Sequence, residues 1–244
     1  MSKKQRESSR TARAAAVQRA QVTRERNRRI MITGAVMAVL AGIVVAGVLL
    51  SGGNSSGPDS NVRAGVTIEG QALVLGTERD APTKVVVYED FLCPYCREFE
   101  TATRDLLHDA AAAGDVTVEY RPFQLLPDHY SARSLTAWAA VVQKGTPEQA
   151  LRFHDLLFDN QPYEDAPDKP GVEELVSLAK EAGVDDQEVL DSMGEENPEF
   201  VAATTQTARD AGIQGTPTVL VNGQELEGES VTAMVRTLEG MIGK

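Results

Sequence analysis

The chain has 244 residues, and its 36 acidic side chains outnumber its 24 basic ones, which gives a formal net charge of −12 at pH 7. The charge is unevenly divided: residues 1–29 hold ten Lys/Arg and two Glu, whereas residues 30–244 hold fourteen Lys/Arg and thirty-four Asp/Glu. No aromatic residue interrupts the basic segment, so it offers no stacking surface for bases, and we expect no nucleic-acid partner.

Ile30–Leu50 is a run of twenty-one residues without a charge, which matches the ~20 residues that cross a bilayer as a helix. The basic flank predicts that residues 1–29 form a cytoplasmic tail and that the C-terminal part lies outside the cytoplasm. The run is longer than the roughly 7–15 apolar residues of a cleaved signal peptide. We therefore predict an uncleaved signal-anchor and a single-pass protein of the cell membrane. A twin-arginine export signal around Asn27–Ile32 is the alternative.

Residues 51–61 are rich in Gly and Ser and predict a flexible linker. The remaining residues, 62–244, suit one domain. Their patterns predict a β-α-β portion at the start and a β-β-α portion at the end. Between these portions, residues from about 131 to 212 have helical periodicity and are divided by Gly and Pro into about five helices. The expected strands are Lys84–Asp90, Val116–Tyr120, Val219–Val221 and Gln224–Leu226, and the flanking helices are Arg97–Ala113 and Ser230–Ile242.

Cys93 and Cys96 are the only cysteines of the chain, and they lie three residues apart between a predicted strand and a predicted helix. The N-terminus of a helix stabilises a thiolate on the first sulfur. Pro94 suits the first helical turn, where a missing N–H is no loss. Cys96 lies one turn further along, close enough to form a disulfide with Cys93. This placement predicts thiol–disulfide exchange, which needs no cofactor because the two sulfurs carry both electrons.

A zinc site and a structural disulfide are the alternative interpretations of this cysteine pair. Zinc takes about four ligands, and the three histidines of the chain are scattered without ligand spacing, so we expect no metal. A structural disulfide would close too short a loop to stabilise the fold much. We expect His154, on an apolar helix face, to be a structural residue and Trp138 to lie in the core or a groove.

Gly215–Thr218 (GTPT) lies directly before a predicted strand and about 120 residues after the cysteine pair. Together the two motifs resemble the thioredoxin-fold thiol oxidoreductases, in particular the membrane-anchored bacterial members of the DsbA-like branch. The similar stretches bracket nearly all of residues 66–242, and they are Ala72–Gly76, Ala81–Phe99, Phe153–Phe158 and Gly212–Gly223.

The resemblance implies an α/β thioredoxin fold with an inserted helical subdomain, preceded here by the predicted transmembrane helix. It implies that Cys93 is the nucleophile, that Cys96 is the resolving thiol, and that Pro217 is cis and faces them. The backbone of Thr216 would then be free to pair with an extended substrate segment.

Two positions of the active-site segment depart from the family pattern. Tyr95 stands where many oxidases of the family carry a histidine, and Val87 stands where the family often carries a buried carboxylate. With Pro94, Tyr95 would shape the site without a positive charge, which implies a milder oxidant. We also expect the nearby carboxylates of Glu89 and Asp90 to raise the pKa of Cys93 by repulsion.

The leading hypothesis is a membrane-tethered, monomeric oxidoreductase that introduces disulfides into exported proteins. A membrane protein, quinone-linked, would reoxidise its dithiol. Only about 30 residues separate the predicted span from the strand before the cysteines, too few for the dimerisation domain that isomerases of this kind carry. A disulfide isomerase or reductase of the same fold is the first alternative. The second is a redox-silent peptide-binding module, against which the presence of both cysteines argues.

Overall fold

A computed structural model of the chain describes residues 65–76 and 81–242. The predicted tail 1–29, transmembrane helix 30–50 and linker 51–61 lie outside these residues. None of the helices formed by residues 65–76 and 81–242 is both long and apolar enough to cross a membrane.

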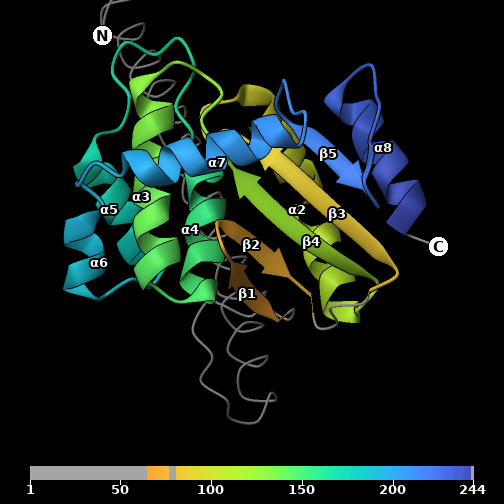
Figure 1. Cartoon of the computed structure of the whole chain (residues 1–244), viewed down its shortest axis with the longest axis horizontal. Helices are drawn as coiled ribbons and strands as arrows, with labels where there is room; N and C mark the ends of the chain where they lie inside the picture. The colour runs from red at the N-terminus through yellow and green to blue at the C-terminus, as the bar shows by residue number, and fades with distance from the viewer. Residues whose placement is uncertain (1–64, 77–80, 243–244) are drawn as a thin grey trace, which may run out of the picture. The chain divides into compact units, whose positions relative to one another are not determined.

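A six-stranded mixed sheet has the order β1-β2-β4-β3-β5-β6 (Figure 1). Only the β3–β4 pair is parallel, and every other neighbouring pair is antiparallel. The strands are β1 (Val66–Glu69), β2 (Ala72–Leu75), β3 (Thr83–Glu89), β4 (Val116–Pro122), β5 (Thr218–Val221) and β6 (Gln224–Glu225). The helices are α2 (Pro94–Ala113), α3 (His129–Lys144), α4 (Pro147–Asp159), α5 (Val172–Glu181), α6 (Gln187–Ser192), α7 (Pro198–Asp210) and α8 (Val231–Ile242).

Strand β3 lies inside the sheet, and its last five residues are all buried. Its apolar run is continuous because helices cover both faces of the sheet. Val85 and Val87 belong to the main core, to which α2 and α8 also contribute. Val86 and Tyr88 point to the opposite face, where they pack with Ala208 of α7 (Figure 1). The β3–α2–β4 unit is thus held on both sides.

The order and type of the predicted elements are confirmed, with ends that differ by at most three residues. The predicted insert is present as the five helices α3 to α7. The β1–β2 hairpin was not predicted. It pairs with β4 through Leu73 opposite Tyr120 and so extends the sheet at the edge distant from β5.

The strand register explains how two distant motifs meet. Tyr88, near the end of β3, pairs with Thr218, the first residue of β5. The chain enters the cysteine turn directly after β3, and the Thr216–Pro217 loop directly precedes β5. Both loops therefore lie at the same end of the sheet, 123 residues apart in sequence.

Candidate active site

The cysteine turn forms the N-terminus of α2. Cys93 is the N-cap residue and Pro94 occupies the first helical turn, while the N–H groups of Cys96 and Arg97 donate to the Cys93 carbonyl at 3.1 and 3.2 Å. Both cysteines are free thiols. Cys93 is 6% exposed and Cys96 is completely buried, whereas Tyr95 is 61% exposed. Of the two sulfurs, only that of Cys93 is within reach of another molecule.

The Thr216–Pro217 peptide bond is cis, as the resemblance implied. The thiol of Cys93 donates a hydrogen bond to the Thr216 carbonyl, with Sγ and O 3.4 Å apart. The structure therefore brings together all the residues predicted for the site, which are Cys93, Cys96, Pro94, Tyr95, Thr216 and Pro217.

The two sulfurs differ strongly in acidity. A hydrogen bond from the Cys96 thiol and the N–H groups of Cys96 and Tyr95 stabilise the Cys93 thiolate. The buried Thr216 hydroxyl has no hydrogen-bond partner while Cys93 is a thiol, and it donates to the sulfur once Cys93 is a thiolate. Although burial opposes these donors, they lower the pKa of Cys93 from 9.0 to about 6. Burial raises the pKa of Cys96 well above 9.0, and the charges of Cys93 and Glu89 raise it further. At neutral pH the reduced site is therefore one thiolate and one thiol.

The expectation that Glu89 and Asp90 raise the pKa of Cys93 is wrong. Hydrogen-bond donors around Cys93 determine its acidity, and the Glu89 carboxylate acts on Cys96 instead. Both carboxylates are completely buried and have partners of their own, since Glu89 contacts His154 and Asp90 accepts the N–H of Leu92.

Asp90 fixes the turn between β3 and α2. Its Oδ1 accepts the N–H of Leu92 at 2.9 Å. Its Oδ2 accepts the N–H groups of Leu125 and Leu126 at 2.8 and 2.9 Å and the hydroxyl of Ser131 at 2.7 Å. One buried carboxylate thus ties the cysteine turn to the loop that leads into the helical insert.

A second buried group lies below the dithiol. His154 Nε2 is 2.6 Å from Glu89 Oε1, and all three side chains of Glu89, Glu100 and His154 are completely buried. Burial alone would lower the pKa of His154, but the charge of Glu89 and the hydrogen bonds to Asp155 and Glu89 raise it to about 10. Burial, and after it the charge of Glu89, raise the pKa of Glu100 well above its usual value.

Among the described residues, Glu89, Glu100 and His154 could hold a metal ion, because their ligating atoms lie within 4.8 Å of one another. Two ligands of one Zn²⁺ would stand roughly 3.4 Å apart, given bonds of about 2.1 Å. The 2.6 Å contact between His154 and Glu89 is shorter, as a direct hydrogen bond between the two side chains requires. We interpret the group as an ion pair of His154 and Glu89 beside a third buried carboxyl, and His154 as a core residue.

Gln161 also supports the site, although no sequence pattern pointed to it. It lies just after α4, and its Nε2 donates to the carbonyls of Phe91 and Cys93, both at 3.0 Å. A lone glutamine in a loop has no recognisable pattern. Only the packing of the insert against the cysteine turn reveals its role.

Comparison with known proteins agrees with this geometry. A family model described as Thioredoxin matches residues 69–239. The Na(+)/H(+) antiporter NhaA 3 of Salinispora tropica is 30% identical over 152 residues, which are 62% of this chain and 22% of the antiporter. Disulfide bond formation protein D of Bacillus subtilis is 31% identical over 170 residues, covering 66% of this chain and 72% of that protein.

A similar solved structure is MdbA, a thiol-disulfide oxidoreductase from Corynebacterium diphtheriae. It has a TM-score of 0.61 and 25% sequence identity, and the match covers 76% of this chain and 99% of MdbA. The chain belongs to the thioredoxin family. Its site is that of a thiol–disulfide oxidoreductase, whose reaction is thiol–disulfide exchange.

Proposed function

We propose that the protein is a membrane-tethered oxidoreductase that introduces disulfides into exported proteins. One observation carries the proposal: a nearly buried, strongly acidic Cys93 lies against the Thr216 carbonyl, with the buried, weakly acidic Cys96 behind it. A low pKa stabilises the reduced form of the pair and so favours transfer of a disulfide to another protein.

In the oxidised protein, a substrate thiolate attacks Sγ of Cys93. A bond forms between the two sulfurs, the Cys93–Cys96 bond breaks, and Cys96 takes up a proton and leaves as a thiol. A second substrate thiolate then attacks the substrate sulfur of this mixed disulfide and releases Cys93 as a thiolate. The substrate has lost two electrons and the pair has gained them. The low pKa of Cys93 makes it a good leaving group in the second step.

The reduced pair needs a reoxidising partner. We propose a quinone-linked membrane protein, because the uncharged run 30–50 would tether the domain to the same membrane. The net charge of residues 30–244 would repel the domain from an anionic lipid surface, and the Gly/Ser segment 51–61 would give it room to turn between partner and substrate.

The relatives support the oxidising direction only through what their names say, disulfide bond formation protein D above all. Because Tyr95 supplies no positive charge, we expect a reduction potential between about −120 and −230 mV, the range between strong oxidases and glutaredoxins. A milder isomerase or reductase would fall at the lower end of this range or below it.

The test is an oxidation assay with the full-length, oxidised protein and reduced, unfolded ribonuclease. We expect one substrate disulfide per protein molecule, and the variant with both cysteines replaced by alanine should form none. A potential near −270 mV, the value of thioredoxin, together with reduction of insulin, would contradict the oxidase proposal. A reporter fused after Lys244 tests the topology, since it should be active only if it functions outside the cell membrane.

A further inference from the structure

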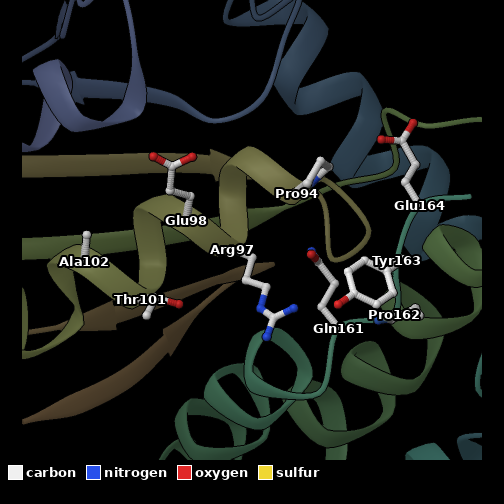
Figure 2. Close-up of a pocket in the computed structure, with 9 residues that line it drawn as sticks. All are labelled: Pro94, Arg97, Glu98, Thr101, Ala102, Gln161, Pro162, Tyr163 and Glu164. Atoms are coloured by element: carbon white, nitrogen blue, oxygen red, sulfur yellow. The ribbon is translucent and has the colours of Figure 1, made fainter.

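A cavity of about 410 Å³ opens beside the dithiol, between the first turns of α2 and the segment 161–164 that follows α4 (Figure 2). This volume lies within the roughly 300–1,000 Å³ of ligand pockets. Pro94, which directly follows Cys93, lines the cavity, and so does Gln161, which donates to the Cys93 carbonyl. The cavity therefore begins where the reactive turn ends.

The walls of this cavity are mostly carbon. Pro94 and Ala102 contribute from α2, and Pro162 and the ring of Tyr163 contribute from the opposite segment. Tyr163 is 79% exposed, and Tyr95 in the cysteine turn is 61% exposed. Large aromatic side chains left in solvent around a reactive group are typical of an interaction surface.

Arg97 adds a cation to this apolar surface. Figure 2 shows its side chain on the side of α2 that faces Gln161 and Tyr163, whereas Glu98 points away from them. Arg97 has no ion-pair partner within 65–76 and 81–242, the part of the chain that the structure describes. A free guanidinium can stack on an aromatic ring and donate to peptide carbonyls.

Building on the proposed function, we propose that this cavity binds an aromatic side chain of the polypeptide substrate, close to the substrate's reactive cysteine. Cys93 contacts two surfaces, Thr216 through its sulfur and Gln161 through its carbonyl. A chain that pairs with Thr216 and reacts at Cys93 continues over Pro94 into the cavity.

The length of the cavity limits which residue can enter it. The α2 residues from Pro94 to Ala102 rise about 12 Å along the helix, which an extended chain covers in about four residues. The aromatic residue should therefore lie within about four positions of the substrate cysteine. Unfolded chains expose aromatic side chains and folded ones bury them, so the cavity would select substrates whose cores have not yet closed.

The test compares two peptides with one cysteine each, carrying Phe or Ser three positions away. The full-length protein should oxidise the Phe peptide about tenfold faster, the factor that burial of much of a ring provides. Ala102→Leu narrows the cavity and Tyr163→Ser removes one wall, and both positions are exposed, so the fold should tolerate them. Each variant should reduce the preference to about threefold or less. As a control, Met241→Ser removes a 49% exposed side chain in α8 and should keep the full preference for the Phe peptide.

Equilibrium binding of a labelled Phe peptide with Ser in place of its cysteine gives a second measurement that needs no exchange chemistry. If the Phe peptide binds more tightly than the Ser peptide, and if Ala102→Leu and Tyr163→Ser both weaken its binding, the cavity is the binding site. This result would hold even if neither peptide were oxidised, and in that case only the proposed function would fail. Equal binding and equal oxidation of both peptides, or a preference unaffected by both variants, would overturn the inference.

Discussion

Thr216→Val tests why Cys93 is acidic, because it removes a hydroxyl and keeps the size of the side chain. Four donors stabilise the thiolate, and the Thr216 side chain is one of them. A hydrogen bond to a charged group contributes about 1.5–3 kcal/mol, and one pKa unit corresponds to about 1.4 kcal/mol. With three donors left, we take the lower end of this range and expect the pKa of Cys93 to rise by about one unit, to about 7.

The rate of alkylation of the reduced protein by iodoacetamide measures this change. At pH 6 the thiolate fraction should fall from about one half to about one tenth, and the rate should fall roughly threefold or less, because nucleophilicity rises with pKa. At pH 9 the thiolate is complete in both proteins, so the variant should react about threefold faster. The two pH profiles should therefore cross. Thr216→Ser keeps the hydroxyl and should follow the unmodified protein.

The stability of the reduced protein gives a second measurement. The pKa of Cys93 is about 6 in the folded protein and about 9.0 in the unfolded chain. Below pH 6 the thiolate therefore adds nothing to the free energy of unfolding. It adds about 1.4 kcal/mol per pH unit from there to pH 9, and about 4 kcal/mol above it. His154, with its raised pKa, has the opposite slope between pH 6.5 and about 10. His154 makes this contribution in both redox forms, however, so it cancels in the difference between their free energies of unfolding.

Urea unfolding of the reduced and oxidised protein should therefore show a difference that grows in favour of the reduced form as the pH rises from 6 to 9. In Thr216→Val this growth should start about one unit higher. If the pH profile of Thr216→Val equals that of the unmodified protein, the Thr216 hydroxyl does not stabilise the Cys93 thiolate. The same conclusion follows if Thr216→Ser, which keeps the hydroxyl, is shifted as much as Thr216→Val.

Three further predictions concern the buried residues of the site. Cys96→Ala should accumulate mixed disulfides with substrate and Cys93→Ala should not, as a gel under non-reducing conditions will show; equal trapping by both would remove the assignment of roles. His154→Leu leaves the buried Glu89 carboxylate unpaired and should cost about 3–5 kcal/mol in urea unfolding, whereas a cost below about 1 kcal/mol would mean that the pair is not ionised. Asp90→Asn replaces an acceptor of four hydrogen bonds and should destabilise the fold by about 3 kcal/mol, with loss of oxidation rate exceeding the loss of folded protein.

The sequence was sufficient for the elements that have a long pattern or a distinctive one. β3 has a continuous apolar run and α2 begins within a cysteine pair that contains a proline, so both were predicted to within three residues. The β1–β2 hairpin was missed because each strand has only four residues. Four residues are too few for alternation to stand out, and their partner β4 lies more than forty residues away.

The buried polar groups were beyond prediction for a different reason. Glu89, Glu100 and His154 come from β3, α2 and α4, and no local pattern connects them. In a single sequence each resembles a surface charge or an isolated core residue. The effect of Glu89 on Cys96 rather than on Cys93 depends on which side of the turn its side chain enters, and only the packed structure determines that.

The start of α2 has one more consequence. As a thiol, Cys93 makes no capping hydrogen bond to the helix it begins. As a thiolate, it accepts from the N–H groups of Tyr95 and Cys96, which are the second and third residues of the helix, the two amides that a serine or aspartate cap would satisfy. In the oxidised protein the Cys93 sulfur belongs to a disulfide, carries no charge, and cannot replace the thiolate as the acceptor of these two N–H groups. Each turnover would therefore cap and uncap a helix of 20 residues, and amide hydrogen exchange in its first turn should slow on reduction and quicken on oxidation.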